Sequence, residues 1–389
     1  MNATRCSIIL CWLAAAWQTA SADEESLDHL IPPGYEPEEV RDEQGLWMEF
    51  EELERSLNQS AMLVRDADIN EYIADIVCRT AGPYCEDFRV YVVRNSNFNA
   101  SMTATGMMQI WTGLIVRARS TDEIAAVVGH EIAHYTRLHS LQRLRDIKKK
   151  MAAGSIFDLG LILATGTSVP IGQMTAMLSL LAFNREQETE ADILGTRLIA
   201  NAGYNPHASY QVWNRLIAED EAAAVQREDP GMFSKTHPAS EDRANYLERL
   251  VTTMYGPADV EEVTDAKLLE ILNSHYLFLM EDQIDTNRFG RTKELLERHR
   301  EMGVEPGLVY YFYGEMFRQR ADEGDPQRAK DAYLHSVETG SAPPEAYKNL
   351  GYLYLKSGDT IAAQAQFRNY LDANPDASDR AMIEFYLEE

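Results

Sequence analysis

The sequence of 389 residues predicts a mainly α-helical protein with a small β-sheet, followed by an α-helical repeat domain. Apolar residues recur at helical spacing over most of the chain. Runs rich in β-branched and aromatic residues, at Phe88–Asn95 and from Met107 toward Ala118, are typical of strands, the second turning into a helix. In the last third, glycines recur every 34 residues, at Gly290, Gly324 and Gly358, which is the period of a helical repeat.

The N-terminus predicts a secretory signal peptide over residues 1–22. Arg5 precedes an apolar run from Ile8 to Trp17, and the small residues Ala20-Ser21-Ala22 follow before an acidic stretch. The run is too short to span a bilayer, although an uncleaved anchor is the alternative. We therefore expect cleavage after Ala22 and export.

The charge of the chain excludes some classes of partner. It has 36 basic and 62 acidic residues and a net charge of −26, and loss of Arg5 with the signal peptide would make it −27. Such acidity argues against binding to nucleic acid or to anionic lipid surfaces. The remaining length suggests two domains.

The segment after the signal peptide, residues 23–45, is acidic and contains prolines, so we expect a flexible lead. Helical spacing begins at Leu46 and continues to about Cys78. Cys78 and Cys85 are the two cysteines beyond the signal peptide, and Gly82-Pro83 lies between them. In an exported chain they predict one disulfide; two buried thiols are the alternative.

The stretch "AAVVGHEIAHYTRLH", residues 125–139, has the order His-Glu-x-x-His. Ser120–Glu123 forms a capping box that opens its helix. His130 and His134 lie on one helix face and can reach one metal ion, while Glu131 is placed to touch a water on that metal. Zinc binds neutral imidazole and acidifies its water, so the stretch supplies two ligands and a general base.

The residues around this motif favour a site over a chance match, which occurs at roughly the per cent level in a chain of this size. The preceding residues are apolar, as a buried site needs, and Gly129 permits close approach by another backbone. His139 would lie about 140° round the helix from His134, so we do not expect it to be a ligand.

A second helix, from Asn184 to about Gly203, offers a third ligand. Glu188 and Asp192 are four residues apart in "REQETEAD" and share a face. One can bind zinc while the other accepts the free N–H of a ligating histidine. A solvated acidic face is the alternative, and other divalent ions also suit a site of two histidines and a glutamate.

Between these two helices lies an apolar segment, residues 156–183, divided by glycines and a proline. We expect a buried or lid-forming helical hairpin, with shallow membrane contact as the alternative. A further helix is expected at about Ser209–Arg227, before "KTHPASEDRANYL".

The region after Gly256-Pro257 resembles tetratricopeptide repeats. Ala329 matches Ala363 and Tyr333 matches Phe367, each 34 residues apart. Two repeats are clear and a third is degraded; an ordinary helical domain is the alternative. Stacked helix pairs form a concave surface, which predicts binding of peptides or proteins.

The motif His130–His134 with Glu188–Asp192 resembles zinc metallopeptidases of the CAAX-prenyl-protease and HtpX type, metallopeptidase family 48, over roughly residues 45–255. The resemblance implies a zincin-type α+β domain at residues 46–255, of the gluzincin class, with one Zn²⁺ per chain. It makes Glu188 the third ligand, Asp192 the partner of a ligating histidine and Glu131 the catalytic base.

In "THPASEDR", the resemblance implies that His237 approaches the zinc, either as a latent fourth ligand or as an oxyanion stabiliser assisted by Arg243. One stretch departs from the family, because Asn99-Ala100-Ser101-Met102 stands where members commonly carry Asn-Ala-Phe-Ala. We still expect an edge strand near Gln109–Trp111 to accept an extended substrate.

With the helical repeats of residues 256–389, the chain is most similar to exported, periplasmic members that act in outer-membrane protein assembly. This implies a zinc endopeptidase that cleaves unfolded or misassembled envelope proteins. Its repeats would contact envelope assembly proteins, with at most peripheral membrane contact. Alternatives are a chaperone or assembly scaffold with a latent zinc site, and a membrane-embedded protease with intramembrane substrates.

Overall fold

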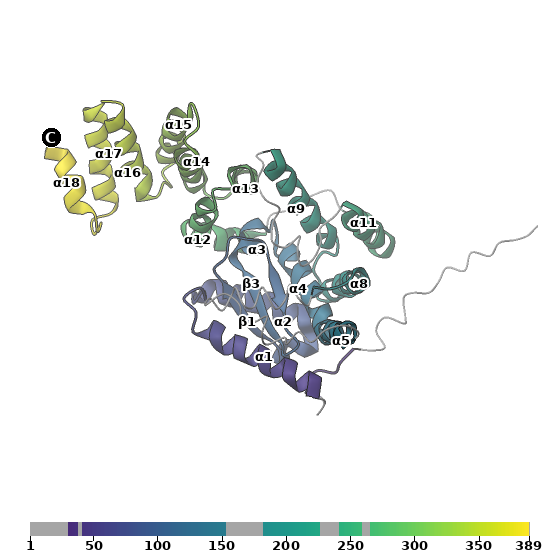
Figure 1. The fold of residues 1–389 in the computed structure, drawn as a ribbon. Coiled ribbons are helices and arrows are strands. Elements are labelled where there is room, and N and C mark those ends of the chain that lie inside the picture. Colours follow the sequence, from purple (N-terminus) through teal and green to yellow (C-terminus); the bar gives the residue numbers. More distant parts are fainter. Residues whose placement is uncertain (1–29, 38–40, 153–181, 226–240, 259–264, 389) are drawn as a thin grey trace, which may run out of the picture.

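The computed structural model describes residues 30–37, 41–152, 182–225, 241–258 and 265–388. The expected signal peptide, His237 and most of the apolar segment 156–183 lie outside these residues. Within the described part of the chain, no helix combines the length and the apolar character needed to cross a membrane. The architecture is mainly helical with one small sheet (Figure 1), as expected.

The sheet has three strands in the order β1-β3-β2, namely β1 (Arg89–Val93), β3 (Met107–Trp111) and β2 (Ala100–Met102). β3 pairs in parallel with β1 and antiparallel with β2, and Ser101 lies opposite Gln109. A tight turn at Gly106, whose φ is 79°, joins β2 to β3. A Cβ at Gly106 would lie 2.2 Å from the backbone oxygen of Asp87, so the turn requires glycine.

The expectation that residues Gln109–Trp111 form an edge strand is wrong. β3 is central because β1 occupies one of its sides and β2 the other. The outer side of β1 is covered as well, since the amide of Val64 donates to Val92 and that of Arg94 to Met62. Among the described residues, the strand at the edge of the sheet is β2, a short buried strand that sequence reasoning missed.

Side chains alternate between the two faces of β3, as a strand requires. Met108 and Ile110 face a large core that includes helices α2 (Ala67–Ala81) and α4 (Thr121–Thr136). Met107 and Trp111 face a second core with α1 (Arg41–Asn58) and α5 (His139–Ala152). The sheet is therefore buried between two helical layers.

The helical spacing noted from Leu46 to about Cys78 corresponds to two helices, α1 and α2, and the chain between them runs along β1. The predicted disulfide is confirmed. Cys78 near the end of α2 is joined to Cys85 in the 3-10 helix Gly82–Asp87.

Helix α4 lies between the sheet and α8 (Arg185–Asn201) (Figure 1). Helix α9 (Ala208–Val225) also packs against α4, and α11 (Glu241–Tyr255) packs against α8 and α9. The two helices α4 and α8 touch at glycines. A Cβ on Gly129 would lie 2.8 Å from the carbonyl oxygen of Gly195, and one on Gly195 would lie 2.7 Å from the amide of His130. The close approach expected at Gly129 is thus observed.

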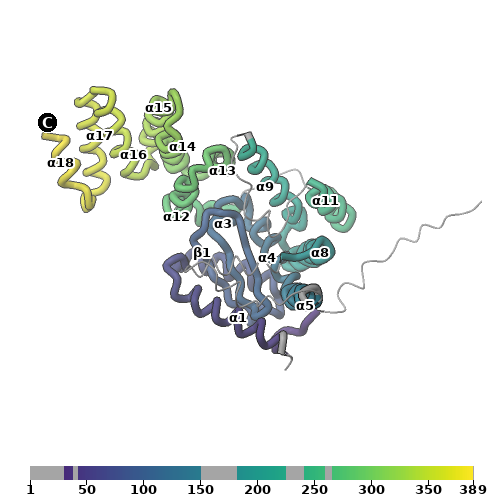
Figure 2. The backbone as a smooth tube through the Cα atoms, in the orientation of Figure 1, coloured from purple at the N-terminus to yellow at the C-terminus, as the bar shows by residue number. Residues whose placement is uncertain are grey.

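The C-terminal region is a stack of helices, which extends away from the N-terminal domain (Figure 1, Figure 2). The helices are α12 (Ala266–Asp285), α13 (Phe289–Met302), α14 (Pro306–Arg320), α15 (Asp325–Glu338), α16 (Pro344–Lys356), α17 (Thr360–Ala373) and α18 (Arg380–Glu388). Gly314 faces the ring of Tyr333, and Gly351 faces that of Phe367 in the same way. These two helix pairs are therefore equivalent, although their glycines are not 34 residues apart.

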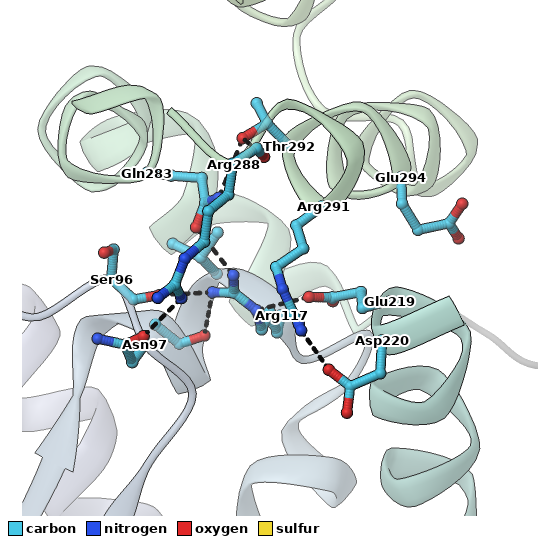
Figure 3. A network of polar contacts seen from close by, with 12 residues as sticks. Ser96, Asn97, Arg117, Glu219, Asp220, Gln283, Arg288, Arg291, Thr292 and Glu294 are labelled. Carbon is cyan, nitrogen blue, oxygen red and sulfur yellow. Dashed lines mark hydrogen bonds and ion pairs between the residues drawn. The ribbon is translucent and has the colours of Figure 1, made fainter. Parts of the chain in front are cut away.

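The hydrophobic core continues through the domain boundary predicted between residues 255 and 256. One cluster extends from Ile31 to Met316 and includes residues of α12, α13 and α14. Polar contacts accompany it (Figure 3), with Arg117 of α3 (Thr112–Arg117) bound to Glu219 at 2.8 Å and to Gln283 of α12 at 2.8 Å. The first repeat helices are thus built onto the N-terminal domain.

Candidate metal centre

Helix α4 presents the His-Glu-x-x-His motif from a buried position. Ser120 caps the helix by accepting a hydrogen bond from the Glu123 amide at 3.3 Å. The Glu123 carboxylate accepts from the amide of Arg119 rather than that of Ser120, so the predicted capping box forms with a shifted partner. The helix that follows is buried throughout the motif.

Helix α8 begins with a complete capping box. Asn184 accepts from the amide of Gln187 at 2.9 Å, and the Gln187 side chain accepts from the Asn184 amide at 3.2 Å. This cap places Glu188 in the first turn of α8, where it is buried against α4. Sequence reasoning missed the cap, although Asn-x-x-Gln is one of its signals.

The three predicted ligands converge. The Nε2 atoms of His130 and His134 are 3.0 Å apart, and the Glu188 carboxylate oxygens lie 3.5 Å from the first and 3.7 Å from the second. Ligand atoms around a tetrahedral zinc ion lie about 3.3 Å from one another. The donor set and its spacing therefore fit one zinc ion.

The other nitrogen of His130 faces Asp192. Its Nδ1 lies 3.0 Å from Asp192 Oδ1, the arrangement expected for the partner of a metal-ligating histidine. Arg243 of α11 donates to both Asp192 oxygens, at 2.8 and 2.7 Å, and lies 3.0 Å from Glu188. Its guanidinium also lies over the ring of Trp213, at 4.1 Å.

These contacts control the charge of the site. Burial opposes ionisation of Asp192, but the charge of Arg243 and the hydrogen bond with His130 hold the pKa of Asp192 below its usual value. Burial alone would lower the pKa of His130, whereas hydrogen bonds with Asp192 and Glu188 raise it to about 9. The buried carboxylates thus favour positive charge at this position.

Glu131 and Arg243 were predicted to act in catalysis. Glu131 is buried, with 1% of its surface exposed, and follows the ligand His130 on α4. Arg243 lies within electrostatic reach of it. Arg243 contacts the carboxylates of Glu188 and Asp192, and its role beside His237 as oxyanion stabiliser stays a prediction.

Two aromatic side chains contact His134. The ring of Phe183, at the end of the apolar segment 156–183, stacks on the imidazole with centroids 3.8 Å apart. His139 lies with its Nδ1 2.8 Å from the Nδ1 of His134. As expected, His139 is not one of the three clustered ligands, but sequence reasoning missed its contact with one of them.

Comparison with known proteins places these residues in a family. Residues 64–251 match the model of Peptidase family M48. Over 200 residues the chain is 30% identical to the putative beta-barrel assembly-enhancing protease of Vibrio cholerae, a match that covers 49% of this chain and 40% of that protein.

Two further relatives differ in how much of the chain they match. The mitochondrial metalloendopeptidase OMA1 of Schizosaccharomyces pombe is 30% identical over 165 residues, 41% of this chain and 46% of its own. The beta-barrel assembly-enhancing protease of Escherichia coli is 24% identical over 364 residues, 83% of this chain and 72% of its own.

The chain thus spans less than half the length of the Vibrio and Schizosaccharomyces relatives. The matched residues include the helix with His130 and His134 and the helix with Glu188, the three side chains that converge on one point. Residues 64–251 of this chain form a domain of peptidase family M48.

Proposed function

We propose that this chain is an exported zinc-dependent endopeptidase that cleaves unfolded or misassembled proteins of the bacterial envelope. The observation that carries the proposal is the convergence of His130, His134 and Glu188 beside the buried carboxylate of Glu131. Relatives named as metalloendopeptidases and as beta-barrel assembly-enhancing proteases support it.

The proposed metal site takes one zinc ion, held by two imidazole nitrogens and one carboxylate. When bound, zinc acidifies a water molecule to a pKa of about 7 and polarises the carbonyl of the scissile peptide. Glu131 is the residue placed to accept the proton of that water and to deliver it to the leaving amine. Asp192 and Arg243 keep His130 and Glu188 in place during this transfer.

We propose that the substrate pairs with β2, the strand at the edge of the sheet. An extended polypeptide beside Ala100–Met102 would continue the sheet with main-chain hydrogen bonds, which tolerate many side chains. β2 also lies against α4, so this edge brings a peptide near the helix that carries Glu131. Unfolded proteins suit such a site because their backbone is available for pairing.

The helical repeats are the proposed contact with envelope assembly proteins. A groove of about 510 Å³ between α13, α14 and α15 is lined by several aromatic and basic side chains, among them Tyr310, Tyr313, Phe317, Arg328 and His335. Cleavage of residues 1–22 would deliver the chain to the periplasm. The proposed membrane contact is peripheral at most.

A chaperone or assembly scaffold with a latent metal site is the second candidate. The stacking of Phe183 on His134 and the burial of all three ligands favour it, because a substrate carbonyl needs access to the metal. Under this alternative His237 would be the fourth ligand, and His237→Ala would cleave faster than wild type. Slower cleavage would favour the oxyanion role.

The deciding experiment compares residues 23–389 with the variant Glu131→Gln, both loaded with zinc. We expect wild type to cleave an unfolded protein and the variant to lose at least about a hundredfold of that activity. Zinc content, measured by mass spectrometry, should be equal in both. Equal inactivity of both zinc-loaded proteins would contradict the peptidase and favour the scaffold.

A further inference from the structure

His139 lies behind the metal centre and has no role in the function described so far. Its side chain is fully buried and begins α5, the helix after the one that carries the motif. Its Nδ1 is 2.8 Å from the Nδ1 of His134, the nitrogen that faces away from the other two ligands. The two rings meet edge to face, at a centroid distance of 5.0 Å.

A backbone turn brings His139 to this position. In a continuous helix it would lie about 140° round from His134, but α4 ends at Thr136 and α5 begins at His139. Between them Leu138 has a φ of 52°, in the left-handed region that a branched side chain rarely occupies. Such a conformation costs free energy and persists where the surroundings hold it. Here the turn directs His139 back toward the last turn of α4.

The second nitrogen of His139 is also held. Its Nε2 lies 3.2 Å from Glu190 Oε2, and the other oxygen of Glu190 lies 2.8 Å from Arg137 Nε. The carbonyl oxygen of His139 accepts a hydrogen bond from Gln187 at 3.4 Å. A side chain of α4, His134, and one of α8, Glu190, therefore hold the imidazole at its two nitrogens.

The direction of the hydrogen bonds follows from metal binding. A His134 that binds metal through Nε2 carries its proton on Nδ1 and must donate it. His139 Nδ1 is then the acceptor, so the proton of His139 is on Nε2 and is donated to Glu190. His130 reaches a carboxylate directly, at Asp192, whereas His134 reaches one through a second imidazole.

We propose that His139 is a positioning residue of the metal centre, which holds His134 in the tautomer and ring orientation that present Nε2 to the ion. Glu190 and Arg137 hold His139 in turn. The proposal rests on the metal site proposed above. The proposal is tested by measuring metal affinity, so the test does not depend on proteolytic activity.

The test measures the zinc dissociation constant of residues 23–389 by competition with a chelator. His139→Phe keeps an aromatic ring but removes both nitrogens, and we expect zinc to bind about 10–100-fold more weakly. His139→Asn retains an acceptor near the position of Nδ1, and affinity should return to within about threefold of wild type. The visible spectrum of the Co²⁺-loaded protein should change in the Phe variant and be restored in the Asn variant.

His299→Phe is the matched control. His299 is as fully buried as His139 and is held on both nitrogens, by Tyr276 and by the carbonyl of Val116, but it lies in α13 away from the metal ligands. We expect it to lower the unfolding temperature without changing the zinc dissociation constant.

Three results would overturn the proposal. They are an unchanged zinc affinity in His139→Phe, a loss of affinity that His139→Asn does not restore, and an equal loss in His299→Phe. If His139→Phe does not fold, Glu190→Ala replaces it, since it removes the partner of His139 Nε2. Zinc affinity unchanged in that variant would count against the proposal. Failure of wild type to bind zinc would instead contradict the metal site itself.

Discussion

Arg243 shows how a single side chain can hold two elements of the site together. It contacts Glu188 and Asp192 on α8, although it lies on another helix, α11, 51 residues after Asp192 in the chain. Both carboxylates are buried, and a buried charge without a partner is costly. The arginine therefore allows two acidic side chains to be buried side by side, Glu188 among the candidate ligands and Asp192 against the Nδ1 of His130.

Asp192 is the residue at which this arrangement is most directly tested. Asp192→Asn can still accept the hydrogen bond of His130 but lacks the charge that balances Arg243. We expect zinc affinity to fall about 10–100-fold, measured by chelator competition.

Glu186→Gln is the control for Asp192→Asn, because Glu186 lies exposed in the first turn of the same helix. It removes a similar charge without touching the site, so zinc affinity should be unchanged. An equal loss of affinity in the two variants would show that the charge of α8 as a whole, rather than the contact with His130, matters.

At the scale of elements, the metal centre depends on how closely α4 and α8 approach. Gly129 and Gly195 face each other at the crossing, where neither position has room for a Cβ. Close-packed interiors cannot absorb an added methyl group without moving. Glycine is required here by the space between backbones, since neither residue has a positive φ.

Gly195→Ala should therefore push the two helices apart. Its Cβ would meet the backbone of His130 itself, so we expect unfolding free energy to fall by about 1–3 kcal/mol and zinc to bind more weakly. Urea unfolding and chelator competition measure the two effects.

Gly45→Ala is the control for this substitution. Gly45 lies in α1 with no atom near the added Cβ and with an ordinary φ. Alanine there should preserve stability or raise it slightly, because it favours the helix more than glycine does. Unchanged zinc affinity in Gly195→Ala would show that the crossing tolerates a wider spacing.

At the scale of the whole molecule, the repeats and the peptidase domain are joined by buried polar contacts (Figure 3). Glu219 of α9 is fully buried and binds Arg117 of α3 at 2.8 Å and Arg298 of α13 at 3.0 Å. Next to Arg298, the imidazole of His299 contacts the carbonyl of Val116 at 2.8 Å. These contacts couple the first repeat helices to the segment that follows β3.

This interface predicts a dependence of stability on pH. Burial lowers the pKa of His299 to about 4, whereas an unfolded chain takes up the proton near 6.5. The unfolded state therefore binds more protons between these values, so stability is full above about pH 6.5 and falls as pH decreases toward 4.

Between pH 7.5 and pH 5 this group should account for about 2 kcal/mol of lost unfolding free energy. Urea unfolding at the two pH values measures it, and His299→Gln should lack this part of the loss. His335→Gln, at an exposed histidine of α15, is the control and should behave as wild type. A pH dependence unchanged in His299→Gln would assign the effect to other groups.

Much of this site could be predicted from the sequence because its ligands are arranged by local periodicity. The spacing of His130 and His134 determines that both lie on one helix face, and the spacing of Glu188 and Asp192 does the same on the second helix. The disulfide between Cys78 and Cys85 closes a short loop and is local in the same sense. The 34-residue period likewise indicated the stacked helices before the fold was known.

Only the tertiary structure decided which strand is central, how far the core extends beyond residue 256, and what His139 and Arg243 contact. These features depend on residues far apart in the sequence, or on a single left-handed residue such as Leu138. Helical periodicity predicts the direction of a side chain only relative to its own helix. It therefore does not predict contacts that depend on a turn between helices or on pairing between distant segments. The sequence by itself thus predicted the candidate ligands, and the packing of separate elements determined which residues hold them in place.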